Sequence, residues 1–270
     1  MELFKLAGIG LVLGITTAIP GVSTGTIAVV FNVYDRLIKT ITPNIKIILA
    51  AWKFWLPLVI GGVAGIFLFS RVITFLFNNY FVPANWFFIG IILGSLPMVY
   101  KKAAQGGAAL PALSSIICCV LALTLMAVMA IHKPAEGSVS WTVLTPQVFI
   151  ILFAGGALAA IAMIVPGISG SFLLLVTGLY RTILQAVSDL NLPLVLPVAL
   201  GAIMGILSGA AFVRFLLAKV PKETYGAVLG LVAGSVLVIF PGGFGSGITI
   251  LFSVLSLLAG GSISFFVGRQ

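Results

Sequence analysis

Six apolar stretches restrict this chain more than any other feature of its sequence. They cover residues 54–77, 86–100, 108–131, 193–217, 225–240 and 247–267. A helix needs about 20 apolar residues to cross the hydrocarbon core of a bilayer. The two shorter stretches reach that length only with flanking residues such as Val82–Asn85. The sequence therefore predicts an all-α membrane protein.

The charge content excludes a soluble fold. Only 7% of the residues are charged and 61% are hydrophobic, whereas a soluble domain carries about a quarter charged residues. The net charge of +9 does not indicate nucleic-acid binding, because the Lys and Arg residues lie in short loops without interleaved aromatic residues. The N-terminal apolar stretch lacks a small-residue cleavage signature, so we expect no removable signal peptide.

Two further apolar stretches, 3–39 and 148–186, are each interrupted in the middle. The first contains A-I-P-G-V-S-T-G-T at 18–26, and the second contains V-P-G-I-S-G-S at 165–171. Proline and glycine together stop a helix, and the Ser and Thr residues that follow are good N-caps for a new one. Each stretch therefore predicts a helix, a polar turn and a second helix.

The two interruptions belong to an internal repeat. Pro20-Gly21-Val22-Ser23 aligns with Pro166-Gly167-Ile168-Ser169, and Tyr34 then falls opposite Tyr180. After a change of register the matches resume, pairing Pro57, Gly61, Gly65, Gly90, Gly94 and Ser95 with Pro197, Gly201, Gly205, Gly230, Gly234 and Ser235. The sequence predicts repeat one at 1–131, a linker loop at 132–147 and repeat two at 148–270, each repeat being a hairpin followed by three spans.

The distribution of basic residues indicates that the repeats are inverted. If each interrupted stretch returns to its starting side, one membrane face collects Lys5, Arg36, Lys39, Lys46, Lys53, Lys101, Lys102, Lys219, Lys222 and Arg269. If each stretch crosses once, these charges divide almost evenly. Cytoplasmic loops carry the excess of Lys and Arg, so the hairpin arrangement is favoured, with both termini cytoplasmic. Hairpins whose arms cross the membrane completely would also return to their starting side. Arms of about 17 residues are at the lower limit for spanning, so they favour re-entrant hairpins.

The polar turns are candidate anion sites. A helix N-terminus presents unpaired backbone N–H groups and the positive end of its dipole. Hydroxyl donors and glycines that allow close backbone approach surround both turns: Ser23, Thr24, Thr26, Ser169 and Ser171, with Gly21, Gly25, Gly167 and Gly170. The alternative is that these Ser and Thr residues only cap their own helices. Two matching turns in opposed repeats favour a shared binding site near the midplane.

Arginines within apolar stretches supply a second signal. Arg71 and Arg214 lie inside predicted spans, and Arg181 lies on the second arm of the second hairpin. An arginine at depth usually faces the bundle interior or a water-filled cavity, although snorkelling to the interface is an alternative, above all for Arg214. Asp35 either pairs with neighbouring Arg36 at the surface or carries a coupling proton.

Enzyme chemistry is not expected. His132 lies in a loop, and no carboxylate pair, metal-ligand cluster or nucleophile–base set is visible. The adjacent Cys118 and Cys119 suit neither a relaxed disulfide nor a metal site. We therefore expect no catalytic residue, no metal and no cofactor.

The quoted motifs, with Y-D-R-L-I at 34–38 and G-L-Y-R at 178–181, resemble the polyprenyl-phosphate transporter family, formerly domain-of-unknown-function family 368. The resemblance covers nearly the whole chain, and the paired Pro-Gly-x-Ser motifs are its most specific part. One departure is Thr24, where the family motif has glycine.

The resemblance implies a flippase that returns undecaprenyl phosphate from the outer to the inner leaflet of the bacterial cytoplasmic membrane, for recycling of this cell-envelope lipid carrier. The phosphate would sit on the hairpin N-termini and arginines, while the tail stays in lipid. Moving it inward against the membrane potential predicts a coupling proton or sodium ion. An oligomer is compatible with this reading. The main alternative is a transporter or channel for a small soluble anion; a lipid-phosphate enzyme or an assembly protein fits less well.

Overall fold

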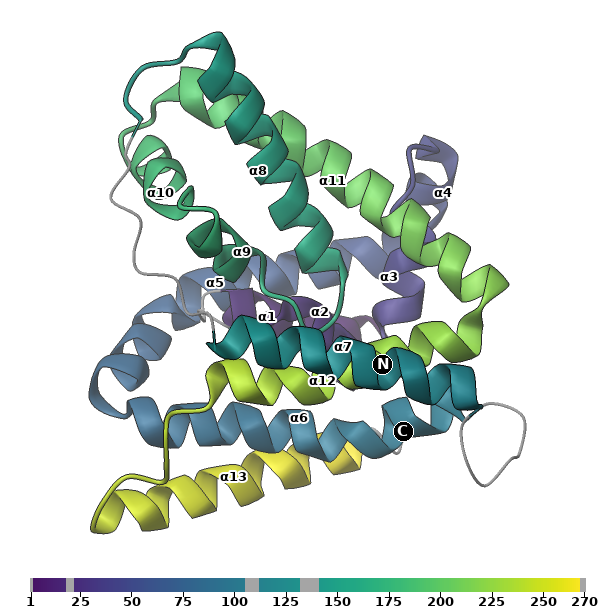
Figure 1. Cartoon of the computed structure of the whole chain (residues 1–270), viewed down its shortest axis with the longest axis vertical. Helices are drawn as coiled ribbons and strands as arrows, with labels where there is room; N and C mark the ends of the chain where they lie inside the picture. Colours follow the sequence, from purple (N-terminus) through teal and green to yellow (C-terminus); the bar gives the residue numbers. More distant parts are fainter. Residues whose placement is uncertain (1, 18–21, 105–111, 132–140, 268–270) are drawn as a thin grey trace.

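The computed structural model describes residues 2–17, 22–104, 112–131 and 141–267, and these residues form helices and connecting turns without any strand. The helices, seen in Figure 1, are α1 (Glu2–Thr17), α2 (Thr24–Val30), α3 (Tyr34–Thr40), α4 (Ile45–Ala50), α5 (Trp52–Asn79), α6 (Phe81–Ala103), α7 (Leu113–Ile131), α8 (Pro146–Ile164), α9 (Gly170–Val176), α10 (Tyr180–Ser188), α11 (Leu192–Lys219), α12 (Pro221–Ile239) and α13 (Ile248–Val267).

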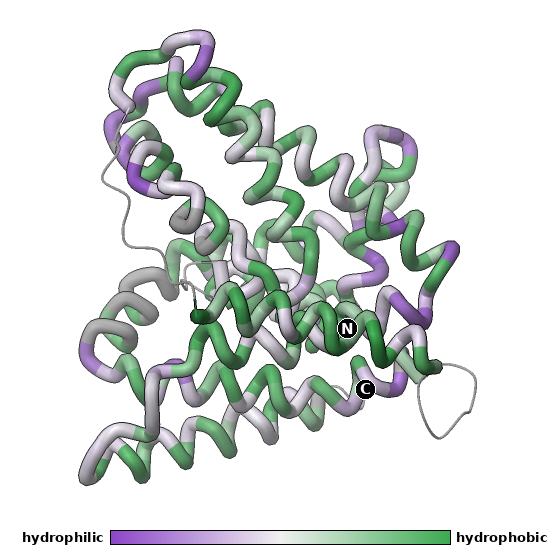
Figure 2. The backbone as a smooth tube through the Cα atoms, viewed as in Figure 1, coloured by the Kyte–Doolittle hydropathy of each residue, from purple (hydrophilic) through white to green (hydrophobic). Residues whose placement is uncertain are grey.

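The predicted membrane-protein class is confirmed. Six helices within the described ranges are long and apolar enough to cross a bilayer, namely α6, α7, α8, α11, α12 and α13. The sequence predicts α8 only as an arm of the second hairpin. In α5, the apolar run Trp52–Leu68 is shorter within a 28-residue helix. Figure 2 shows hydrophobic residues along the long helices and hydrophilic residues gathered at their ends and in loops.

The second arm of each interrupted stretch differs from the prediction of one continuous helix. It is broken again, into α2 and α3 in the first stretch and into α9 and α10 in the second. The breaks contain Asn32, with φ of 55°, and Gly178, with φ of 71°. Asn and Gly are the residue types that adopt this left-handed conformation most readily. Asn32 and Gly178 have the same separation along the chain as Pro20 and Pro166, so the second break recurs at the matching place.

Glycines set the close packing of two helix pairs. A Cβ atom on Gly61 of α5 would lie 2.0 Å from the carbonyl oxygen of Ala7 in α1, and one on Gly201 of α11 would lie 2.0 Å from that of Phe153 in α8. Small residues let membrane helices approach closely enough for dense van der Waals contact. The pairs α1–α5 and α8–α11 therefore meet through Gly61 and Gly201, which are partners in the internal sequence repeat.

Gly61→Ala should lower the stability of the folded protein by about 3 kcal/mol, because the added methyl group meets rigid backbone rather than a flexible side chain. Gly8→Ala, on the same helix pair, is the matched control, since a Cβ at Gly8 has nothing within 4 Å. Gly8→Ala should be neutral or stabilising. Thermal unfolding of the two variants in detergent checks this, and equal midpoints would contradict the close α1–α5 contact.

The remaining long helices form contacts between the two predicted repeats. Helix α6 packs on α13, α12 packs on α7, and α6 and α12 also contact each other. Figure 1 shows these four helices side by side in the lower part of the molecule. The third span of each predicted repeat thus packs on the other repeat. The boundaries 1–131, 132–147 and 148–270 stay predictions, and much of the linker lies outside the described residues.

Candidate functional site at the paired turns

The start of α2, which follows the first Pro-Gly-x-Ser motif, contacts the second motif directly. The backbone N–H of Gly167 donates a hydrogen bond of 2.7 Å to the hydroxyl oxygen of Thr26, which lies 141 residues away in the chain. A Cβ atom on Gly25 would lie 3.1 Å from the carbonyl oxygen of Met163 and 3.3 Å from Cα of Pro166. The start of α2 and the chain that leads from α8 to α9 therefore form one structural unit.

The hydroxyl groups of this unit are held locally and are mostly buried. Ser23 is the N-cap of α2, because its side chain accepts a 3.4 Å hydrogen bond from the backbone N–H of Thr26. The hydroxyls of Ser169 and Ser171 are hydrogen-bonded to each other at 2.9 Å. Ser23, Thr26 and Ser169 are 3%, 1% and 8% exposed. The capping interpretation therefore applies to Ser23, which keeps its own O–H proton available to a ligand.

The other predicted turn residues lie around this contact. Thr24 is half-buried at the start of α2. Gly170 begins α9 and is so close to α8 that a Cβ there would lie 2.7 Å from the carbonyl oxygen of Ala159. Gly167 has φ of 92°, a conformation that favours glycine. Gly21 lies outside the described residues.

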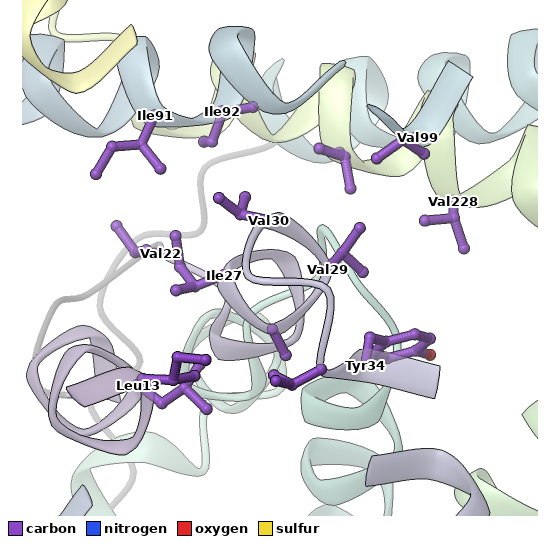
Figure 3. Close-up of a cluster of buried hydrophobic side chains, with 14 of the residues drawn as sticks. Leu13, Val22, Ile27, Val29, Val30, Tyr34, Ile91, Ile92, Val99 and Val228 are labelled. Carbon is purple, nitrogen blue, oxygen red and sulfur yellow. The ribbon is translucent and has the colours of Figure 1, made fainter. Parts of the chain in front are cut away.

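Apolar packing stabilises the position of α2 in this site. Ile27 and Val30 of α2 are fully buried, with exposures of 0% and 1%. Figure 3 shows them facing Ile91 and Ile92, and α2 packs on α6, the helix of these two isoleucines. The first turn of α2 is thereby fixed between the central helix α6 and the second turn.

The short helix α3 connects the site to the second half of the chain. The hydroxyl of Tyr34 donates a 3.0 Å hydrogen bond to the carbonyl oxygen of Ile164, the last residue of α8. The carboxylate of Asp35 accepts from the hydroxyl of Tyr225 at 2.7 and 2.8 Å. No sequence motif indicates a role for Tyr225, and Tyr34 stands out in the sequence only as the repeat partner of Tyr180. Neither contact has a local sequence signal.

Arg214 binds the other end of α3. Its Nη1 donates to the carbonyl oxygen of Ile38 at 2.8 Å and also to that of Ile41, the C-cap residue. A cation is stabilising at a helix C-terminus, where carbonyl groups lack intrahelical partners. In this conformation Arg214 thus fixes α3, at the end opposite to Tyr34.

The remaining predicted residues are more dispersed. Arg181 is exposed and lies at the start of α10. Arg71 lies within α5, but its side chain is outside the described part of the structure. His132 is also outside it. Across the described ranges, no three His, Cys, Asp or Glu side chains gather where they could hold a metal ion.

Comparison with known proteins matches most of this chain to one family. The undecaprenyl phosphate translocase-like family matches residues 13–246. A polyprenyl-phosphate transporter of Staphylococcus aureus is 27% identical over 279 residues, covering 100% of this chain and 98% of the relative. A polyprenyl-phosphate transporter of Vibrio cholerae is 30% identical over 246 residues, covering 86% of this chain and 76% of the relative. No solved structure matches.

Proposed function

Because this chain belongs to the undecaprenyl phosphate translocase-like family, we propose that it returns undecaprenyl phosphate from the outer to the inner leaflet of the bacterial cytoplasmic membrane. The protein is a multi-pass bacterial membrane protein, and its relatives support a role in polyprenyl phosphate transport rather than catalysis. The inward direction serves the recycling of a lipid carrier whose phosphate would otherwise stay on the outer face.

The observation that carries this proposal is the hydrogen bond between Gly167 and Thr26. It joins two turns that each combine a helix start, backbone N–H groups and hydroxyls. Phosphate oxygens accept hydrogen bonds from such groups, and the favourable dipole effect acts within the first turn of a helix. One headgroup bound at this contact would touch both halves of the chain at once.

An inverted pair of re-entrant hairpins is the architecture we propose around this site. The ends of the first hairpin are joined by the ion pair of Arg36 with Glu2 at 3.1 Å. The ends of the second are joined by the hydrogen bond from the backbone N–H of Trp141 to the Thr182 hydroxyl at 3.3 Å. The arms α2 and α9 have seven residues each, or about 10 Å, so neither crosses a bilayer alone.

Headgroup access requires the helices around the paired turns to move. The hydroxyls of Ser23, Thr26 and Ser169 are almost fully buried in this conformation. In the proposed cycle, movements of the surrounding helices expose Ser23, Ser169 and the glycines to one leaflet and then to the other, while the hydrogen bond between Gly167 and Thr26 is kept. Arg71 and Arg181 would attract the phosphate on its way to the turns. Arg214 would act chiefly by holding α3 in place.

The test is leaflet-resolved transport by the purified protein in liposomes. A polyprenyl phosphate with a fluorescent tail is placed in one leaflet, and its movement is followed by selective quenching. The proposal predicts movement that requires the protein, and predicts no efflux of inorganic phosphate or sulfate from the same vesicles. Efflux of soluble anions without lipid movement would favour the small-anion alternative.

Ion coupling is a further part of the proposal. Moving one negative charge inward against an inside-negative membrane potential of 100 mV costs about 2.3 kcal/mol. A phosphate monoester carries about 1.5 to 2 negative charges at neutral pH. Dissipating the proton or the sodium gradient should therefore slow inward transport.

If Asp35 carries the coupling proton, Asp35→Asn should abolish the gradient dependence, whereas Tyr225→Phe should retain it. Equal rates with and without both gradients would contradict coupling.

A further inference from the structure

The segment from Ile45 to Lys53, formed by α4 and the first residues of α5, has an exposed apolar row. Ile45, Ile48, Leu49 and Trp52 are 67%, 40%, 64% and 54% exposed. Their spacing puts them on one side of a helix. Hydrogen bonds from Ala51 N–H to Ile47 O and from Trp55 N–H to Ala51 O, both 3.0 Å, continue the helical register between α4 and α5.

Basic residues flank this row without acidic partners. Lys46 and Lys53 lie about a quarter turn away from the apolar row, and Lys39 is exposed at the end of α3. The ammonium group of Lys53 lies 5.8 Å from the centre of the Trp52 ring. No acidic residue occurs between Asp35 and Glu136 in the sequence. Among the described residues, no carboxylate lies within ion-pair distance of these three lysines.

The position of α4 fits a membrane surface. It directly precedes α5, and Figure 1 shows it at the edge of the molecule, beyond α3 and α11. An apolar face bordered by lysines is the pattern of a helix that lies in the interface, with its apolar side in the acyl boundary and its cations at the headgroups. A basic protein partner would be repelled by the lysines, whereas a leaflet with anionic lipids offers negative headgroups and an apolar layer directly below them.

We propose that Ile45–Lys53 is an interfacial anchor that binds anionic phospholipid headgroups through Lys39, Lys46 and Lys53, with the apolar row inserted below them. This surface is separate from the paired turns, and its ligand is the surrounding leaflet rather than the transported lipid. It would hold the first hairpin at a fixed depth through the short connection from α3.

The test counts lipids that stay bound to the full-length protein after extraction from vesicles of equimolar phosphatidylglycerol and phosphatidylcholine. The parent protein should retain phosphatidylglycerol preferentially, by native mass spectrometry. Lys46→Gln with Lys53→Gln should reduce that preference roughly fivefold per lysine. Lys219→Gln with Lys222→Gln removes the same charge elsewhere and should not. An unchanged preference in the first double variant would overturn the proposal.

A depth measurement tests the apolar row independently. A spin label at Ile48→Cys, with Cys118→Ala and Cys119→Ala to remove the native thiols, should be more accessible to oxygen than to a water-soluble nickel chelate. The reverse accessibility would overturn the anchor.

Adding a polyprenyl phosphate to the vesicles separates the anchor proposal from the proposed transport function. If Lys46 and Lys53 affect the retention of the polyprenyl phosphate alone, this surface binds the transported lipid and the anchor proposal is wrong. If the parent protein transports no polyprenyl phosphate but retains phosphatidylglycerol preferentially, the proposed function is wrong and the anchor still stands.

Discussion

Thr26→Val should lower polyprenyl phosphate transport about tenfold or more, while the protein still inserts and folds. Valine has nearly the shape of threonine but cannot accept the hydrogen bond from the Gly167 N–H. Both residues are buried, so this N–H group would lose its partner, at a cost of about 1–3 kcal/mol. That cost falls on the contact between the two turns, which the proposed headgroup site requires.

Two matched variants separate this effect from a general loss of stability. Thr26→Ser keeps the hydroxyl and should retain most of the transport rate. Thr124→Val removes a hydroxyl that bonds only to the carbonyl oxygen of Val120 in its own helix, at 2.9 Å on the exposed side of α7, and should be neutral. Initial rates of leaflet transfer, normalised to reconstituted protein, provide the comparison. Full activity of Thr26→Val would show that the turn contact is dispensable.

Arg214→Ala should reduce transport several-fold and loosen α3. Removing the guanidinium leaves the carbonyl groups of Ile38 and Ile41 without their cationic donor. Hydrogen bonds to charged groups contribute about 1.5–3 kcal/mol each. We therefore expect faster amide hydrogen exchange in residues 34–42. Arg214→Lys should restore part of both properties, because one ammonium group still reaches the end of α3.

The two roles considered for Arg214 predict different results. If it fixes α3, Arg214→Ala changes hydrogen exchange and the maximal transport rate, with little change in the lipid concentration that gives half-maximal transport. If it binds the phosphate, that concentration rises while exchange in α3 stays as in the parent. The second pattern would contradict the helix-fixing role assigned here.

Much of the helical framework follows from the sequence, because long uncharged stretches have no stable alternative to helices in lipid. Both residues of the hydrogen bond between Thr26 and Gly167 are among the site residues that the sequence predicts. The opposed re-entrant hairpins that would bring matching Pro-Gly-x-Ser motifs together stay a prediction. The second breaks were missed. Asn32 and Gly178 lie in otherwise apolar sequence, where hydropathy does not register a change of backbone direction. Their matching positions in the two repeats were the available signal.

The partners of Tyr34, Asp35 and Arg214 could not be predicted from the sequence. Each is a contact between segments more than a hundred residues apart, and in two of the three the group on one side is a backbone carbonyl, which no sequence pattern marks. An intramembrane arginine indicates that some polar partner exists. It does not say whether that partner is a helix end or a ligand.

Photocross-linking with a polyprenyl phosphate that carries a diazirine next to its phosphate tests the headgroup position most directly. After illumination in liposomes and digestion, we predict labelled peptides from both turns, residues 22–26 and 165–171, with competition by unlabelled lipid. Labelling confined to the lipid-facing helices α7 and α13, or to one turn only, would contradict a shared headgroup site where the two halves meet.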